Sequence, residues 1–177
     1  MKDVMLSLLP EIEGIQDPRL RDLTLTVWAD AMKRGGWSPD DLRAMPFTLL
    51  IKKVGVSLVD HTRAVTCTAL SIAKAMNAAY AGHVRVNLDV LLAGAILHDV
   101  GKLFEYERKD GVFVKSREGE LLRHPVSGAA FAFGYGLPHE VIHIIAAHSK
   151  EGDGGRRTIE AVIVNHADFV NFDVFKD

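Results

Sequence analysis

The chain has 177 residues, 48% of them hydrophobic, and this length and composition suit one domain with its own core. Its 21 basic and 23 acidic side chains give a formal charge of -2, which excludes a whole-chain field that would draw the protein to nucleic acid or an anionic membrane. The single cysteine excludes an internal disulfide, and no uncharged apolar stretch reaches the ~20 residues that span a bilayer. We therefore expect a cytoplasmic protein with one domain over residues 1–177.

The first part of the chain predicts packing helices. Asp17 followed by Pro18 is typical of a helix start, and apolar residues recur on one face of this segment until Gly35-Gly36 end it. Ser38 and Asp41 have the spacing of a capping box, which predicts a second, short helix.

Two longer helices are predicted next. The first runs from Ser57 to about Tyr80, with His61 near its start and Cys67 within it; we expect this thiol to be buried and structural. The second follows Asn87, a good N-cap, and is apolar on nearly every side over residues 88–98. Such a helix belongs in the middle of a domain.

The most informative stretch, His98-Asp99-Val100-Gly101-Lys102, ends this apolar run. A carboxylate carried into an apolar interior needs a compensating charge, because an unpaired buried carboxylate is very costly. A metal ion is the partner that we expect. Gly101 is expected to release the chain from helical geometry directly after the pair.

Charged residues dominate the segment between Glu105 and Arg123. Turn signals at residues 109–111 and 117–119 flank Val112-Phe113-Val114, and this pattern predicts a small β-hairpin or flap near residues 111–122. Two interpretations remain open for it, a lid beside a site and a solvated connector.

Helices are predicted again beyond this segment. His124-Pro125 opens one of them, and another ends at His148. A Gly-rich charged loop over residues 151–157 precedes a last helix that reaches Asp168. The expected fold class is therefore all-α, with the hairpin as its one non-helical element.

Side chains able to bind a metal lie near helix ends or in apolar segments throughout this pattern. Four imidazoles and two carboxylates match the nitrogen and oxygen ligation preferred by Fe, Mn, Co, Ni or Zn. Six ligands exceed what one ion takes from protein when it also holds water, so a two-ion site fits better. The candidate ligands are His61, His98, Asp99, His124, His148 and Asp168.

The order of these residues resembles the HD-domain superfamily of metal-dependent phosphohydrolases. The resemblance covers about residues 55–172 and implies a helical, metal-binding HD core there, with residues 1–54 as N-terminal packing helices. The segment 98–102 is similar to the HD-x-G-K variant. His124-Pro125-Val126 and Ala146-Ala147-His148 resemble the additional histidine segments of two-metal members, which include 3'-5' exoribonucleases and cyclic-dinucleotide phosphodiesterases. The glycine-tyrosine-proline signature of the latter is absent.

The resemblance also implies roles for individual residues. Asp99 would bridge two ions, one held by His61, His98 and Asp168 and the other by His124 and His148. The implied reaction is two-metal hydrolysis of a phosphoester, in which the metal lowers the pKa of a bound water from ~15.7 toward ~7. Asp99 and Lys102 are the expected catalytic residues, and Lys102 would contact the substrate phosphate or the leaving oxygen.

Arg156 and Arg157 are further candidates for phosphate binding, although a solvated arginine pair is the alternative. The expected substrate is a small phosphorylated molecule, a nucleotide or a short oligonucleotide. The sequence contains no long basic tract and no aromatic platform, so we expect no stable complex with long nucleic acid. The remaining histidines have a loop position or a poor helical spacing and are left out of the site: His83, His139, His143 and His166.

Two other functions remain open. A minority of HD-domain proteins resemble this ligand set and use iron and oxygen to cleave a carbon–phosphorus or carbon–carbon bond, so a di-iron oxygenase is one alternative. A metal-stabilised binding or signalling module without catalysis is the other, because a fold does not fix a function.

Overall fold

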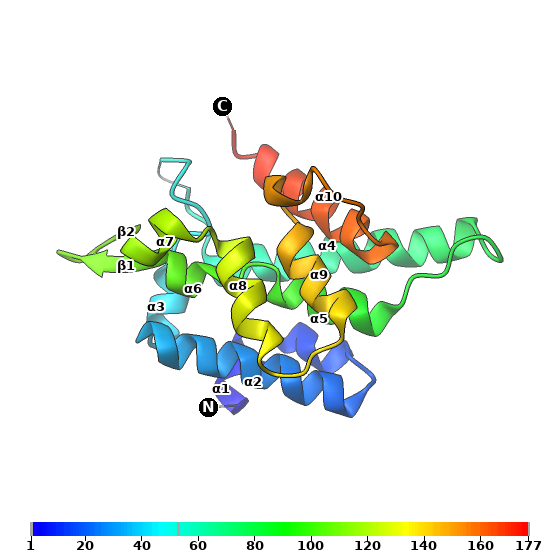
Figure 1. Ribbon diagram of the computed structural model, residues 1–177, viewed down its shortest axis with the longest axis horizontal. Coiled ribbons are helices and arrows are strands. Elements are labelled where there is room, and N and C mark those ends of the chain that lie inside the picture. Colours follow the sequence, from blue (N-terminus) through cyan, green and yellow to red (C-terminus); the bar gives the residue numbers. More distant parts are fainter. Residues whose placement is uncertain (1, 53, 177) are drawn as a thin grey trace.

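The structure is a computed structural model that describes residues 2–52 and 54–176. It confirms the predicted all-α class: helices dominate the described residues, and a small two-stranded sheet accompanies them (Figure 1). None of the described helices combines the length and the apolar character needed to cross a membrane. In chain order the elements are α1 (Lys2–Leu8), η1 (Pro10–Gly14), α2 (Pro18–Gly35), α3 (Pro39–Ala44), α4 (Leu58–Ala79), α5 (Leu88–Leu97), α6 (Lys102–Glu105), β1 (Tyr106–Lys109), β2 (Val112–Lys115), α7 (Arg117–Leu121), α8 (His124–Phe133), α9 (His139–Ala147), η2 (Lys150–Gly152) and α10 (Ile159–Asp173).

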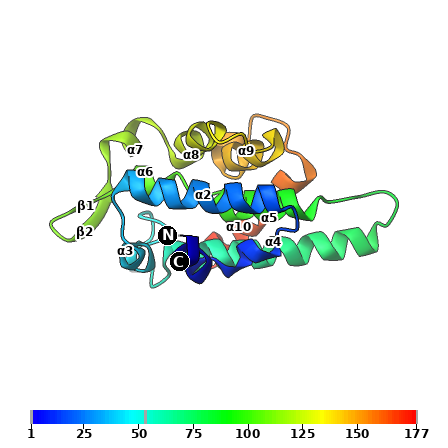
Figure 2. The same cartoon turned by 90° about the horizontal axis from the view of Figure 1, so that it is seen from below.

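Helix α5 is the centre of the packing. The Asn87 side chain caps it by accepting hydrogen bonds from the backbone N–H groups of Asp89 and Val90. Every residue from Val90 to Leu97 is buried, and α5 contacts α2, α4, α9 and α10. Figure 2 shows α2 running along one side of this arrangement while the hairpin projects from one end. Because α5 is surrounded, whatever follows its last residue is delivered into the interior.

Two tryptophans fix the N-terminal helices to the central ones. The Trp28 indole on α2 donates to the carbonyl of Ile96 at 2.9 Å, and the Trp37 indole donates to the carbonyl of Leu103 at 2.8 Å. Both side chains are buried in the common core. Both buried indole N–H groups are therefore hydrogen-bonded.

Helix α4 begins as predicted, with Ser57 as its N-cap, and it carries His61 in its first turns. The expectation that Cys67 is buried is wrong, because this residue is exposed. The inward face of α4 is formed by Val65, Ala69 and Ala73, and a residue two positions past Val65 points to another side of the helix.

The predicted hairpin exists, but its strands lie at residues 106–109 and 112–115 instead of near 111–122. Asp110 and Gly111 both have positive φ, 51° and 79°, which is the signature of a two-residue turn that the strands flank symmetrically. Ser116 then caps α7 instead of extending the sheet. The sequence pattern showed the turn correctly, but the charged first strand carried no apolar signal.

Gly101 does not release the chain from helical geometry, contrary to expectation, since its φ and ψ are -64° and -17°. Its role is steric. A Cβ atom at this position would lie 2.0 Å from the carbonyl oxygen of His124 and 2.8 Å from the backbone nitrogen of Gly128. The lack of a side chain therefore lets the first turn of α8 approach the segment that carries Asp99.

Candidate metal centre

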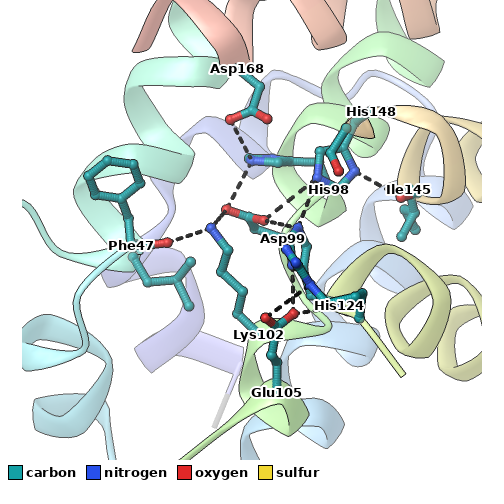
Figure 3. Close-up of polar contacts among 12 residues, drawn as sticks. Phe47, His98, Asp99, Lys102, Glu105, His124, Ile145, His148 and Asp168 are labelled. Atoms are coloured by element: carbon teal, nitrogen blue, oxygen red, sulfur yellow. Dashed lines mark hydrogen bonds and ion pairs between the residues drawn. The ribbon is translucent and has the colours of Figure 1, made fainter. Parts of the chain in front are cut away.

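The structure brings all six candidate ligands together, from five separate helical segments. Figure 3 labels His98, Asp99, His124, His148 and Asp168, whose side chains point toward one another. Four of them lie at or next to helix ends: His98 and Asp99 after α5, His124 at the start of α8, and His148 directly after α9. His61 comes from the first turns of α4, and Asp168 comes from α10. The side chains meet in the interior, where His98, Asp99 and His148 are at most 1% exposed.

The carboxylate of Asp99 lies between two sets of imidazoles. Its Oδ2 is 3.2 Å from Nε2 of His98 and 3.7 Å from Nε2 of His61. Its Oδ1 is 3.2 Å from Nε2 of His124 and 3.7 Å from Nε2 of His148. Each oxygen thus has its own pair of ring nitrogens.

Asp168 adds a second carboxylate on one side of Asp99. Its Oδ1 is 3.0 Å from Nε2 of His61 and 3.9 Å from Nε2 of His98. The ligand atoms of His61, His98 and Asp168 lie within 4.8 Å of one another, as do those of His98, Asp99 and His148. The arrangement contains two overlapping groups of potential ligands, with His98 in both.

Hydrogen bonds orient three of these rings. Nδ1 of His98 lies 2.6 Å from the carbonyl oxygen of Ala95, and Nδ1 of His148 lies 2.8 Å from that of Ile145. A carbonyl oxygen only accepts, so both Nδ1 atoms must carry the proton and both Nε2 atoms present a lone pair. Nδ1 of His124 donates in the same way to Oε2 of Glu105, at 2.7 Å.

This donor set fits a cation. Nε2 of His98 is buried without a hydrogen-bond partner among the described residues, and it faces the Asp99 carboxylate, which also only accepts. Likewise, the Nε2 atoms of His124 and His148 are 3.3 Å apart with no proton assigned to either by their other contacts. Lone pairs held this close repel one another unless a positive charge lies among them, and neutral imidazoles and carboxylates are the usual ligands of transition metals.

The protonation states agree with this conclusion. Burial lowers the pKa of His148 to about 3, so its ring is neutral near pH 7. Burial alone would raise the pKa of Asp99, but the Lys102 ammonium holds it well below its usual range. Burial alone would lower the pKa of His98, but the neighbouring Asp99 carboxylate raises it above its usual value. Near pH 7 Asp99 is therefore charged and His148 is neutral, the forms in which these groups bind metal.

Lys102 lies beside Asp99 and lines the same cavity. Its ammonium donates to Oδ2 of Asp99 at 2.6 Å and to the carbonyl oxygen of Phe47. Phe47 also stacks on the ring of His61, with centroids 4.4 Å apart. The loop before α4 thus supports both the lysine and one of the imidazoles.

Glu105 belongs to the centre although the sequence analysis missed it. Its Oε2 accepts from the backbone N–H of His124 at 2.6 Å as well as from the ring, and its side chain is buried. An acid directly after the apolar pair Leu103-Phe104 was a usable signal, because the argument applied to Asp99 holds for any buried carboxylate. Glu105 holds His124 by two bonds.

A cavity of about 200 Å³ opens onto the centre. His61, Asp99, Lys102, His124 and Asp168 contribute to its wall. Of the two arginines expected to bind phosphate, neither lines it. Arg157 instead donates to the carbonyl oxygens of Ala147 and Ser149, and Arg156 is exposed.

The four histidines left out of the site lie elsewhere. His83 and His166 are exposed. His139 stacks on Phe133, and His143 accepts a hydrogen bond from the backbone of Thr158.

Buried imidazoles and carboxylates gathered at helix ends, beneath a small cavity, define a helical domain built around a candidate metal site. The sequence model of the HD domain family matches residues 58–171, and the chain belongs to this family. The family is the one that the ligand order resembles.

The chain is similar in sequence to three curated relatives. The chain is 37% identical over 112 residues to a dihydroneopterin 2',3'-cyclic phosphate phosphodiesterase of Methanocaldococcus jannaschii, covering 63% of this chain and 44% of the relative. It is 33% identical over 138 residues to ribonuclease Y of Cutibacterium acnes and 29% identical over 134 residues to that of Thermosipho melanesiensis, covering 76% of this chain and 22% of each relative. The chain thus spans less than half the length of these relatives. No solved structure gives a significant match.

Proposed function

We propose that the protein is a metal-dependent phosphohydrolase that acts as a phosphodiesterase on a nucleotide or a short oligonucleotide. The observation that carries this proposal is the central carboxylate of Asp99, each of whose oxygens faces a separate pair of ring nitrogens. Such an arrangement suits a carboxylate that bridges two ions. The similarity to a phosphodiesterase and two ribonucleases supports phosphodiester chemistry.

We assign the ligands by their positions around Asp99. His61, His98 and Asp168 would hold one ion with Oδ2, and His124 and His148 would hold the other with Oδ1. Two divalent transition-metal ions, when bound, would offset charge on phosphate oxygens and lower the pKa of a coordinated water.

Lys102 would bind the substrate in addition to its contact with Asp99. An ammonium has three protons, and two of them are directed to Asp99 and to the Phe47 carbonyl. The third remains for a phosphate oxygen in the cavity that Lys102 lines. Burial alone would lower the pKa of Lys102, but Asp99 raises it above its usual value, so the charge is kept at neutral pH.

The cavity favours a small substrate or the end of a longer one. Its volume of about 200 Å³ is below the ~300–1,000 Å³ typical of pockets that enclose drug-sized ligands. One phosphoester group with part of its substituents fills such a space.

A substrate panel with varied metal tests the proposal. Protein loaded with Mn²⁺, Co²⁺, Ni²⁺, Zn²⁺ or, without oxygen, Fe²⁺ would be assayed on nucleoside 2',3'-cyclic phosphates, dinucleotides and bis(p-nitrophenyl) phosphate. We expect turnover that His98→Ala abolishes together with bound metal. His166→Ala is the matched control, because His166 is an exposed histidine on α10, the helix that carries Asp168.

Two outcomes contradict the proposal. Iron-dependent oxygen uptake without phosphoester hydrolysis would identify an oxygenase. Metal binding in stoichiometric amounts, with no turnover of any phosphoester under any metal, would identify a non-catalytic module.

A further inference from the structure

Arg123 is a cation of the cavity wall whose place beside the metal centre is set by two carboxylates. It directly precedes His124, and its side chain is 44% exposed. Its Nε lies 3.3 Å from Oε1 of Glu105 and 3.9 Å from Oε1 of Glu151. Lys115 and Lys150 also line the cavity, but within residues 2–52 and 54–176 neither side chain forms an ion pair or a hydrogen bond that would hold it at one place.

One buried carboxylate connects Arg123 with a candidate metal ligand. Glu105 uses Oε2 to accept from the backbone N–H and Nδ1 of His124 (Figure 3), while its Oε1 faces Arg123. The Glu105 side chain is only 7% exposed, and its backbone carbonyl accepts from the N–H of Ser116 at 2.8 Å. Because Glu105 is fixed in this way, the guanidinium group is kept close to the ring of His124.

The outer part of this guanidinium group is free. Both carboxylates approach Arg123 at Nε, and its two Nη atoms have no hydrogen-bond partner in the part of the chain that the structure describes. These atoms carry four N–H donors in one plane, in the fork geometry that matches two oxygens of a phosphate group. Arg123 therefore presents an oriented anion-binding group at the cavity wall.

Arg123 and Lys102 approach the central carboxylate from different sides. The Lys102 ammonium donates to Oδ2 of Asp99 at 2.6 Å. Arg123 is connected through Glu105 to His124, whose Nε2 lies 3.2 Å from Oδ1 of Asp99. A phosphate group in the cavity over Asp99 would thus have a cation on each side.

We propose that Arg123 binds the reacting phosphate group of the substrate through its two Nη atoms, on the His124 side of the cavity. Glu105 is the residue that holds the guanidinium group in position for this contact. Arg123 then has the role that the sequence pattern suggested for Arg156 and Arg157. The inference rests on the proposed function, because it concerns the same cavity and the same phosphate group.

Calorimetric titration of Mn²⁺-loaded protein with inorganic phosphate tests this role without turnover. Arg123→Gln should weaken phosphate binding about tenfold or more, since hydrogen bonds between charged groups contribute at least that factor. Arg123→Lys should remain at least ~5-fold weaker than the wild type, because an ammonium group lacks the planar fork. Arg117→Gln is the matched control and should bind phosphate within twofold of the wild type, because Arg117 is an exposed arginine that pairs with Glu120 and does not line the cavity.

Glu151→Gln gives an independent test that leaves Arg123 and the candidate ligands unchanged. It removes a negative charge that lies 3.9 Å from the guanidinium group and keeps the shape of the side chain. Phosphate should therefore bind about twofold more tightly or better, because less of the positive charge of Arg123 is offset. Unchanged or weaker phosphate binding in this variant would contradict the proposed contact.

The Mn²⁺ affinity of each variant separates phosphate binding from a merely structural role. We expect Arg123→Gln to keep its Mn²⁺ affinity within threefold of the wild type. A loss of Mn²⁺ affinity as large as the loss of phosphate affinity would show that Arg123 only supports Glu105, and it would overturn the inference. Wild-type phosphate affinity in Arg123→Gln or in Arg123→Lys would overturn it as well.

The two proposals fail in different ways. Hydrolysis of phosphodiesters by a protein whose phosphate binding does not depend on Arg123 would refute this inference alone. Phosphate binding that depends on Arg123, in a protein that hydrolyses no phosphoester under any metal, would support the contact and refute the proposed function.

Discussion

Replacing Gly101 by alanine perturbs the contact that brings α8 to the metal centre. The added Cβ would lie 2.0 Å from the His124 carbonyl oxygen, whereas carbon and oxygen atoms rarely approach closer than ~3.3 Å. The first turn of α8 must therefore move by about 1 Å, because both clashing groups are backbone and no rotamer change relieves the contact. Gly128 makes the reciprocal approach, with its own Cβ position 3.0 Å from the Gly101 nitrogen.

The expected cost of Gly101→Ala is about 3 kcal/mol, the upper part of the range for overpacked sites. With a urea dependence of ~2 kcal/mol per molar, the unfolding midpoint should fall by about 1.5 M. Displacement of His124 also lengthens its 3.2 Å approach to Asp99, so in calorimetric titration the ion that we propose His124 to hold should bind at least ~10-fold more weakly.

Gly154→Ala is the matched control for this variant. A Cβ at Gly154 meets no atom within 4 Å, so its unfolding midpoint should correspond to a change within ~0.5 kcal/mol. Equal midpoints for the two variants, together with unchanged ion affinities, would refute the steric account of Gly101.

Three further outcomes follow from the packing. Cys67 is exposed, so it should react fully with a thiol reagent in the native protein, and protection until unfolding would contradict its position. Arg157→Ala should destabilise the protein by ~1–3 kcal/mol in urea unfolding, because Arg157 donates to two carbonyl oxygens at the end of α9. Arg156 is exposed, so Arg156→Ala should have little effect. Equal effects of the two substitutions would contradict this stabilising role of Arg157. Trp28→Phe should cost ~1–3 kcal/mol because it leaves the buried Ile96 carbonyl without the indole donor, and an unchanged midpoint would show that this bond contributes nothing.

Helix starts were predictable from the sequence because capping is local chemistry. Asp17, Ser38, Ser57, Asn87 and Thr158 each accept hydrogen bonds from backbone N–H groups two or three residues later. These bonds depend on a few consecutive residues and need no knowledge of the tertiary fold. The burial of Cys67 was mispredicted because composition alone does not say which face of an amphipathic helix a residue occupies.

The central pair was predictable for a different reason. The negative charge of an acid at the end of an apolar helix has to be compensated by a positive charge. This requirement identified His98-Asp99 before any of the residues around the pair were known. The residues that complete the surroundings of the site were not predictable in this way. The Phe47 carbonyl, which binds Lys102, is separated from it by 55 residues, and the steric role of Gly101 appears only when α8 lies against it.

The two kinds of helix end explain how the rings are aimed. At the C-terminal ends of α5 and α9, the last carbonyl groups lack intrahelical donors, and His98 and His148 each donate Nδ1–H to the carbonyl three residues back. The same bond satisfies the helix and turns Nε2 toward Asp99.

His124 lies at the opposite kind of end, the N-terminus of α8, where N–H groups are free and no carbonyl is available. An acceptor must be brought from elsewhere, and Glu105 supplies one oxygen for both the backbone N–H and Nδ1 of His124. The candidate ligand at a helix N-terminus, His124, thus has a carboxylate partner, whereas the candidate ligands at helix C-termini, His98 and His148, use carbonyl groups of their own helices. This arrangement accounts for the buried acid at position 105, which neither the hydrophobic core nor the two groups of potential ligands would explain by themselves.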